Sequence, residues 1–260
     1  PENHLSVFSQ NWLSKNCYDL NLHFDDRSER QKKLWQKDTF EAGLPFVDFE
    51  SICNDVSSKL DMLRLIRDVG FVVLENVPTK EGQVLKVISE LGYTRETNYG
   101  ALFEVRTEVN PNNLAYTNMG LGSHTDNPYR DPVPTVQLLH CLESSTEGGD
   151  SVLVDGFKAA AILRQESKED FDILTGTWIN FRFSDTKTDL RSRVPMIELN
   201  DNNEIVKVRY NNRSIDTINL PIDKIRHFYK AYRHWSEIIE RDDLKITFKL
   251  SEGDLMLLDN

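Results

Sequence analysis

The sequence predicts a mainly β fold with flanking helices, in which a small helical layer surrounds a β-sandwich. From about residue 98 onward, short apolar runs alternate with clusters of Gly, Pro, Asn and Asp, a pattern typical of sandwiches and barrels. Four other segments of the 260-residue chain carry apolar residues at helical spacing. A jelly roll is one architecture that fits both features.

The first part of the chain contains an entry segment and the first helices. Residues 1–44 mix aromatic and charged side chains without strand alternation, and we expect an irregular or helical segment there. Asn54-Asp55 can cap a helix that ends at Gly70, because the apolar residues between them recur at helical spacing. Residues 71–74 then form a short apolar strand, and a second helix is expected over residues 80–91.

Strand-like runs dominate the remainder of the chain. The expected strands cover residues 135–142, 151–154, 177–183, 205–210, 246–250 and 255–258. Helices over residues 157–165 and 222–240 interrupt them. No repeat, low-complexity tract or flexible linker divides the sequence, so we expect a single domain over residues 45–260.

Charge and hydropathy exclude several function classes. The net charge of −11 opposes binding to duplex nucleic acid or to anionic membranes, because both require a clustered positive face. No apolar run reaches the roughly 18 to 20 residues that span a bilayer, and no secretory leader opens the sequence. The three cysteines are far apart, which favours reduced structural thiols over a disulfide framework. We therefore expect a cytoplasmic protein that binds neither nucleic acid nor membrane.

One short motif could bind a metal. His124 and Asp126 are two residues apart, so on an extended segment both side chains point to the same face. Two His and one carboxylate with open positions are typical of non-haem Fe(II) oxygenases. The motif alone is weak, because six His and 23 Asp in this chain give about half a chance match to His-x-Asp. The turn-prone Asn127-Pro128 also fits an exposed loop without a metal.

A longer set of motifs gives the pair its meaning. In order, the chain carries Asn112-Asn113-Leu114-Ala115-Tyr116-Thr117, His124-Thr125-Asp126-Asn127-Pro128, Val136-Gln137-Leu138-Leu139-His140-Cys141, Gly148-Gly149-Asp150-Ser151, Val154-Asp155-Gly156-Phe157, Tyr210-Asn211-Asn212 and Gly253-Asp254-Leu255-Met256-Leu257-Leu258-Asp259-Asn260. These motifs resemble the catalytic core of the γ-butyrobetaine hydroxylase family of Fe(II)/2-oxoglutarate dioxygenases. Trimethyllysine and trimethylaminoethylphosphonate hydroxylases share them, and taurine dioxygenases are related.

The resemblance implies a double-stranded β-helix core and a metal site. It assigns His124 and Asp126 as two iron ligands. The family's third ligand is a His that follows the closing motif, and an Arg beyond it pairs with 2-oxoglutarate, so we expect both beyond residue 260 and the catalytic domain to be incomplete at that end. His140 is expected to be packed in a strand rather than to bind iron. The entry segment 1–44 is expected to be the remnant of a small preceding domain, and His4 is assigned no metal.

The resemblance also assigns contacts to the substrate and cosubstrate. Tyr99, Phe103 and Tyr116 match an aromatic cage, which binds a quaternary ammonium through cation–π attraction because that cation cannot donate a hydrogen bond. Phe103 stands where the family carries Trp. Asn113 and Asn211 match residues near the substrate carboxylate. The expected cosubstrate contacts are Leu139 and Ser151, and lower-ranked candidates for an anionic group are Arg182 and Arg213.

The function implied is hydroxylation of a small trimethylammonium substrate, coupled to decarboxylation of 2-oxoglutarate into succinate and CO₂. γ-Butyrobetaine, giving L-carnitine, is the leading substrate, with 2-trimethylaminoethylphosphonate or trimethyllysine as the alternative. The cofactors implied are Fe(II), 2-oxoglutarate and O₂, with ascorbate as an optional reductant, and a homodimer is common in the family. An alternative of another class is a catalytically inactive module that binds quaternary ammonium compounds.

Overall fold

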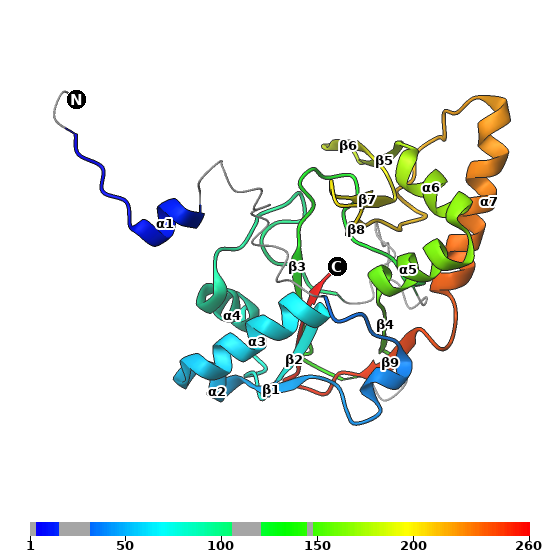
Figure 1. Cartoon of the computed structure of the whole chain (residues 1–260). Helices are drawn as coiled ribbons and strands as arrows, with labels where there is room; N and C mark the ends of the chain where they lie inside the picture. The colour runs from blue at the N-terminus through cyan, green and yellow to red at the C-terminus, as the bar shows by residue number, and fades with distance from the viewer. Residues whose placement is uncertain (1–3, 16–31, 106–120, 145–147) are drawn as a thin grey trace.

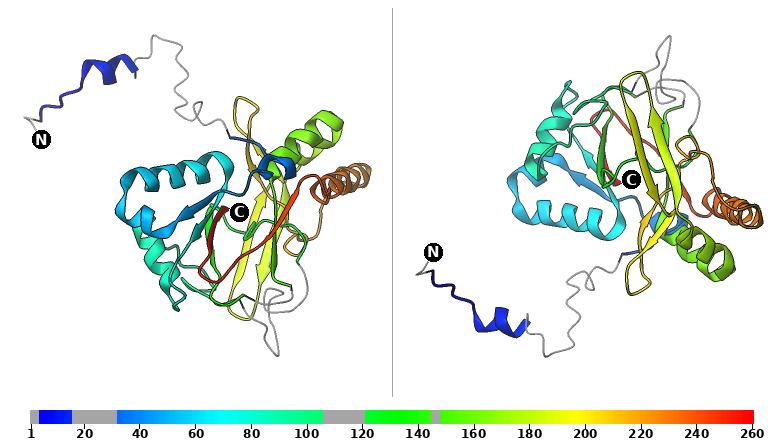
Figure 2. Two further views of the ribbon diagram at one scale, coloured as in Figure 1. Left: turned by 90° about the horizontal axis from the view of Figure 1, so that it is seen from below. Right: turned by 90° about the horizontal axis from the view of Figure 1, so that it is seen from above.

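The computed structural model describes residues 4–15, 32–105, 121–144 and 148–260 (Figure 1). The helices are α1 Gln10–Lys15, the 3-10 turn η1 Lys37–Phe40, α2 Phe49–Asn54, α3 Val56–Val69, α4 Gln83–Leu91, α5 Gly156–Glu166, α6 Lys168–Gly176 and α7 Ile222–Ile239. The strands are β1 Phe46–Asp48, β2 Phe71–Glu75, β3 Val136–His140, β4 Asp150–Val154, β5 Ile179–Ser184, β6 Asp189–Val194, β7 Ile197–Leu199, β8 Ile205–Val208, β9 Lys245–Lys249 and β10 Leu255–Asp259. Helices α2–α4 lie on one side of the strands and α5–α7 on the other (Figures 1 and 2).

The central sheet has four strands in the order β1-β2-β10-β3. β1 runs parallel to β2, and the other two pairs are antiparallel. Alternate residues of β2 and β10 point to opposite faces, as strand geometry requires. Val72, Leu74, Leu255 and Leu257 pack with helices α2–α4, whereas Phe71 and its neighbours on the other face pack toward the β4-β9 pair. This sheet is therefore buried on both faces.

The second half of the molecule is built from the hairpins β5-β6 and β7-β8 and the helices α5–α7. Its core contains Trp235 of α7 and Phe181 of β5, both 0% exposed. α7 is amphipathic, and Phe228, Ala231 and Trp235 lie on its buried face at helical spacing. Helix α5 contacts β8 and helix α6 contacts β7, so these helices cover the β7-β8 hairpin.

Helix boundaries follow from capping residues. Asp55 accepts hydrogen bonds from Ser57 N and Ser58 N at the start of α3, and Gly70, with φ of 93°, ends that helix in the left-handed region. Asp155 caps α5 through the amides of residues 157 and 158 and also accepts a 2.9 Å bond from Trp35 N. One carboxylate therefore attaches the entry segment to the first helix of the second half.

Most expected elements are present, with several corrections. The expected strands match β2, β3, β4, β5, β8, β9 and β10 closely, and the helices at 157–165 and 222–240 match α5 and α7. The second helix begins at Gln83 rather than residue 80, because Gly82 adopts φ of 72° just before it. β1, α2, α6, β6 and β7 were not expected, and helices hold more of the described residues than strands. The expected combination of sheets with flanking helices is present, and the double-stranded β-helix stays a prediction.

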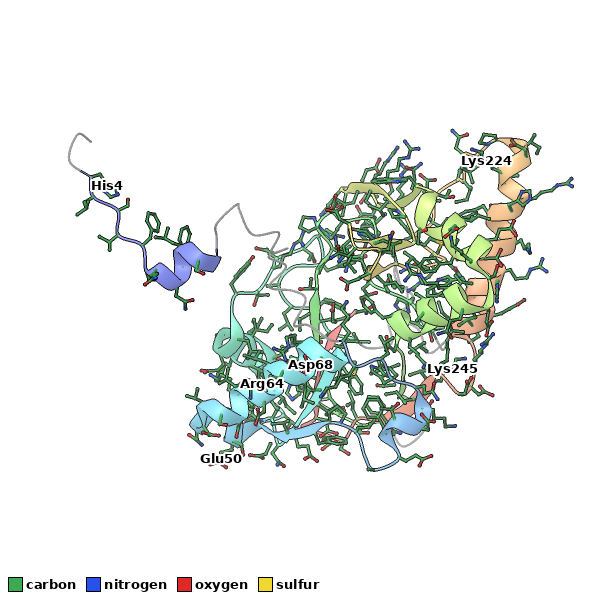
Figure 3. The ribbon with its side chains drawn as sticks, viewed as in Figure 1. His4, Glu50, Arg64, Asp68, Lys224 and Lys245 are labelled. Carbon is green, nitrogen blue, oxygen red and sulfur yellow. The ribbon has the colours of Figure 1, made fainter. Side chains whose placement is uncertain are left out.

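The entry segment is partly helical. The described part of the entry segment contains α1 and η1, as an irregular or helical segment would. His4 lies on this segment away from the body of the molecule, where it hydrogen-bonds Ser6 (Figure 3).

In residues 4–15, 32–105, 121–144 and 148–260, no helix has both the length and the apolar character needed to cross a bilayer.

Candidate active site

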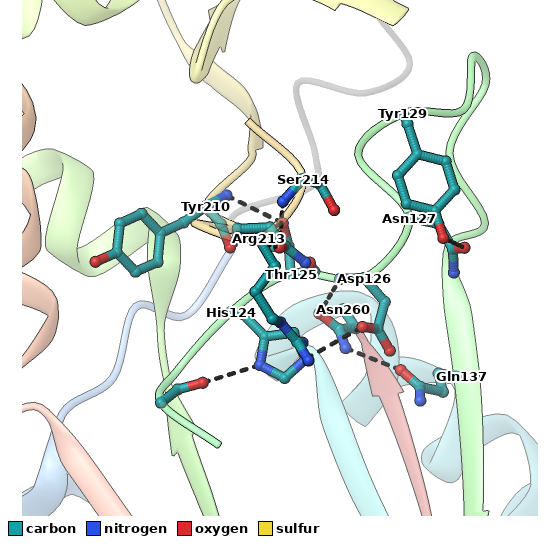
Figure 4. A network of polar contacts seen from close by, with 12 residues as sticks. His124, Thr125, Asp126, Asn127, Tyr129, Gln137, Tyr210, Arg213, Ser214 and Asn260 are labelled. Atoms are coloured by element: carbon teal, nitrogen blue, oxygen red, sulfur yellow. Dashed lines mark hydrogen bonds and ion pairs between the residues drawn. The ribbon is translucent and has the colours of Figure 1, made fainter. Parts of the chain in front are cut away.

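His124 and Asp126 point toward one another from an irregular segment that leads into the turn before β3. Their facing atoms, His124 Nε2 and Asp126 Oδ1, are 3.2 Å apart (Figure 4). The side chains are 23% and 36% exposed, so a small ligand can reach them. The same-face geometry expected from the spacing of the two residues is therefore what the structure contains.

The tautomer of His124 suits a metal ligand. Its Nδ1 lies 2.9 Å from the carbonyl oxygen of Gly122, which can only accept, so Nδ1 donates the hydrogen. In a neutral ring, Nε2 then carries the lone pair and faces the Asp126 carboxylate. Two acceptors that face each other need a cation between them, either a proton or a metal ion. A backbone carbonyl that fixes the second nitrogen is the common arrangement around metal-binding His. The pair therefore fits a divalent metal.

Without a metal, a proton occupies this position, because the facing carboxylate favours the protonated form of His124. The hydrogen bond to Asp126 raises the pKa of His124 despite partial burial. Burial alone would raise the pKa of Asp126, but hydrogen bonds from His124 and Gln137, with the charges of His124 and Arg213, together hold it below the ordinary value. Asp126 is therefore ionised at neutral pH and can serve as an anionic ligand.

The segment that follows β8 holds the middle of the motif. Thr125 N donates to Tyr210 O at 2.7 Å, and Tyr210 N donates to Thr125 Oγ1 at 3.0 Å. Asn211, only 5% exposed, donates from Nδ2 to Thr125 O at 2.8 Å. Its Oδ1 accepts from Arg213 N at 3.1 Å and Ser214 N at 3.2 Å. Asn211 therefore joins the motif to the segment that follows β8, and its substrate role stays a prediction.

A second anchor comes from β3 and the residue after β10. Asp126 N donates to Asn260 Oδ1 at 3.1 Å, and Asn260 Nδ2 donates to Gln137 Oε1 at 2.8 Å (Figure 4). The Gln137 side chain also hydrogen-bonds the Asp126 carboxylate. Gln137 and Asn260 belong to the sequence motifs, but the sequence alone assigns them no role. The signal that was available is that both are amides in otherwise apolar runs.

Within the described residues, no third His, Cys, Asp or Glu joins His124 and Asp126 to form a metal cluster. His140 lies on β3 opposite Leu255, whose side chain packs with helices α2–α4, and burial lowers its pKa. His227 bonds a carbonyl of its own helix, and His234 lies between two acidic side chains of α5 and α6. His227 and His234 therefore have polar partners elsewhere, whereas His140 is packed on the sheet and its buried Nε2 has no hydrogen-bond partner among the described residues.

Aromatic side chains gather near the motif. Tyr99 lies 5.9 Å from Phe103 and 5.7 Å from Phe183, measured between ring centroids. Phe183 in turn stacks on Tyr129 at 5.3 Å. Burial, and then a hydrogen bond with Tyr99, raise the pKa of Tyr129. Tyr99 and Phe103 are thus brought together as expected, Tyr116 and Asn113 lie outside the described residues, and Phe183 and Tyr129 were missed.

The remaining candidates lie on the strands around the site. Leu139 points to the same face of β3 as Gln137 and packs with Met256 in the space between the two sheets. Ser151 of β4 is paired with Phe248, which lines the same space. Arg182 is bound by Asp189 through two hydrogen bonds of 3.0 and 3.2 Å, so it is engaged on the β5-β6 hairpin.

The chain is similar in sequence to known proteins. The model of the family described as taurine catabolism dioxygenase TauD, TfdA family, matches residues 30–260. A γ-butyrobetaine dioxygenase of Homo sapiens is 32% identical over 270 aligned positions, which cover all of this chain and 68% of that protein. A trimethyllysine dioxygenase of Meyerozyma guilliermondii is 28% identical and is covered to 69% by the whole chain.

Solved structures share the fold. The crystal structure of a putative α-ketoglutarate-dependent taurine dioxygenase from Burkholderia xenovorans superposes with a TM-score of 0.59 at 13% identity. The superposition covers 79% of this chain and 74% of that one. With the family model matching almost nine-tenths of the sequence, the chain belongs to the TauD, TfdA family of dioxygenases.

Proposed function

We propose that this protein is an Fe(II)/2-oxoglutarate-dependent hydroxylase of a small trimethylammonium compound, with γ-butyrobetaine as substrate and L-carnitine as product. The observation that carries the proposal is the approach of His124 Nε2 and Asp126 Oδ1 to 3.2 Å, with the His tautomer already fixed. The names of the similar proteins from Homo sapiens and Meyerozyma guilliermondii supply the substrate class.

His124 and Asp126 are the residues that would hold the iron. Bound there together with 2-oxoglutarate and O₂, iron supplies the oxidant for an unactivated C–H bond. The chain contributes a neutral imidazole, an ionised carboxylate and the hydrogen bonds that fix both. We propose that a further His completes the triad from outside the described residues, since none of the described His is near the pair.

We propose that the cosubstrate binds beside Leu139 and Ser151. Leu139 packs against the core between the two sheets, and Ser151 of β4 is paired with Phe248 of the same core. A leucine can cover the methylene groups of 2-oxoglutarate, and a serine hydroxyl can donate to one of its carboxylates. We also propose that the sheets form a double-stranded β-helix, for which the likeness to taurine dioxygenase structures is the support.

The aromatic group is the proposed site of the ammonium head. Tyr99 and Phe103 offer ring faces, and Phe103 is 46% exposed, so its ring is open to a ligand. Each cation–π contact is worth about 0.5 to 2 kcal/mol, with Phe at the weaker end. We assign Tyr116 to the same cage. Asn113 and Asn211 are proposed for the carboxylate end, where the charge of Arg213, which already acts on Asp126, would add attraction.

Organisation and setting complete the proposal. We propose an entry segment over residues 1–44 and a catalytic domain over residues 45–260, a cytoplasmic location, and a homodimer. Trp35 of the entry segment packs on Phe71 at 5.5 Å, so this segment contacts the sheet that carries the site. Ascorbate is proposed as a stimulating reductant rather than a substrate.

The test is succinate formation by the iron-loaded full-length enzyme with γ-butyrobetaine, trimethyllysine and 2-trimethylaminoethylphosphonate. We expect γ-butyrobetaine to give the highest turnover and the other two to give less. Asp126→Ala is expected to weaken Fe(II) binding at least about 100-fold, whereas His227→Ala, on the outside of α7, is expected to bind iron normally. Turnover that no ammonium compound stimulates would refute the substrate assignment, and ammonium binding without turnover would favour the inactive module.

A further inference from the structure

A short turn connects the metal pair to the aromatic group. It covers residues 127–130 and directly follows Asp126. Asn127 adopts φ of 53°, and Arg130 N donates to Asn127 O at 3.1 Å, which closes the turn. Ser192 of β6 donates from Oγ to Pro128 O at 2.6 Å. Because the turn is held at its own ends and from β6, its shape is fixed relative to Asp126.

The turn supports the aromatic group through Tyr129. This side chain is only 6% exposed, and its hydroxyl donates to Asn127 Oδ1 at 2.8 Å. Its ring stacks on Phe183 at 5.3 Å, and Phe183 contacts Tyr99 edge-on at 5.7 Å. Tyr99 therefore rests on a series of packed rings that begins three residues after the proposed iron ligand.

A second connection runs through arginine side chains. Arg130 Nη2 donates to Asn98 Oδ1, immediately before Tyr99 in the sequence. Arg95 Nη1 donates to Pro132 O at 2.8 Å, just beyond the turn. The segment that carries Tyr99 is thus attached to the residues after Asp126 in two ways, by the hydrogen bonds of the two arginines and by the packed rings.

We infer that the turn 127–130 sets the distance between the ammonium pocket and the iron ligands, and so selects which carbon of the substrate is hydroxylated. The inference rests on the proposed function. A cation–π contact holds the ammonium head but scarcely orients the chain attached to it, because the attraction is weakly directional. The position of the reactive C–H bond therefore depends on where the pocket lies relative to the metal. A displacement of about 1 Å can cost about 100-fold in rate.

Tyr129 and Arg130 are accordingly positioning residues that determine specificity for chain length. They act on the substrate through Phe183, Asn98 and Tyr99. Trimethylammonium compounds that are one methylene longer or shorter would place a different carbon at the metal. The turn is therefore expected to discriminate between them, even though the ammonium head is the same in all.

Two single variants loosen this connection while every ring stays in place. Tyr129→Phe removes the hydroxyl that bonds Asn127 and Tyr99, and Asn98→Ala removes the partner of Arg130. Tyr93→Phe is the matched control, because Tyr93 is 89% exposed. In the iron-loaded full-length enzyme, three quantities are measured: the hydroxylated product formed per succinate, the position of hydroxylation, and the dissociation constant of tetramethylammonium by calorimetry.

We expect product per succinate to fall at least about fivefold in both variants, and hydroxylation to spread to a neighbouring carbon. Tetramethylammonium, which is only a head group, should bind within about twofold of the wild type, and so should Fe(II). Tyr93→Phe should match the wild type in every measurement. Thermal melting of each variant shows whether it is folded, and the two variants provide independent tests of the same connection.

Two outcomes would overturn the inference. If folded Tyr129→Phe and Asn98→Ala both keep the wild-type product ratio and position, the turn does not set the distance. If tetramethylammonium binding weakens in step with the product ratio, the turn supports the pocket itself and not its placement. Failure of the proposed function is distinguishable, because it is seen in the wild-type enzyme before any variant is made. If the wild type turns over no trimethylammonium compound, the proposed function is refuted, and this inference is refuted with it.

Discussion

Replacing Asn211 by Ala should destabilise the whole protein and loosen the iron site. The side chain is 5% exposed and makes three hydrogen bonds, one to Thr125 O at 2.8 Å and two from backbone amides at 3.1 and 3.2 Å. At about 1 kcal/mol for each bond, Asn211→Ala should lower the free energy of unfolding by about 3 kcal/mol. For a chain of this size that corresponds to about 6 to 12 °C in melting temperature.

The iron site should respond as well, because Thr125 lies between the two ligands. Loss of a supporting contact of this kind weakens metal binding about 10-fold to 100-fold. Urea unfolding measures the stability, and competition with a fluorescent chelator measures the Fe(II) affinity. The control is Asn202→Ala, at an exposed turn residue, which should change neither. If Asn211→Ala keeps wild-type stability and iron affinity, this reasoning is wrong, and a rise in KM for the ammonium substrate alone would leave Asn211 only the substrate contact proposed above.

Two further predictions concern other parts of the fold. Burial would lower the pKa of His234, but its hydrogen bonds to Asp170 and Glu166 outweigh burial and raise it, while bonds from Arg241 and then His234 hold the pKa of Glu166 at about 2. Because the folded pKa is raised, the stability that protonated His234 contributes is complete below about pH 6.5 and is lost as the pH rises through the folded pKa. The difference in unfolding free energy between the wild type and His234→Gln should therefore shrink from pH 6 to pH 8. A constant difference in urea unfolding would contradict this. Gly253→Ala should lower the unfolding free energy by about 1 to 3 kcal/mol, because Gly253 has a φ of 87° and an added Cβ would lie 3.1 Å from a backbone oxygen. The control Gly176→Ala has no such contact and should be neutral in the same urea unfolding experiment.

The parts of the site that are local in sequence could be predicted. His124 and Asp126 share a face because they are two residues apart in the sequence, and this depends on local backbone geometry alone. The partners of that segment could not be predicted in the same way. Gln137 and Asn260 meet because β3 pairs with β10, and the register of two distant strands is decided by the packing of the whole sheet.

The missed elements have similar explanations. β6 carries Ser192 on its buried side, where it bonds a carbonyl of the turn 127–130, so its apolar alternation is interrupted. α6 follows α5 after a single residue, and Ser167 ends one helix while it caps the next, which hides the boundary in a continuous helical pattern. Phe183 was expected in a strand, but its contact with Tyr99 depends on a tertiary approach that no spacing rule describes.

The anchoring of the metal motif ties iron affinity to the fold as a whole. Residues 125 and 126 have no regular secondary structure of their own and are held by partners 85 and 134 residues away in the sequence. The native site therefore exists only while distant strands stay docked, and iron that binds the native state alone adds RT ln(1 + [Fe]/Kd) to its stability. Iron content should consequently report on folding, so that a destabilising substitution far from the site is detected first as a rise in the iron concentration needed for half-saturation.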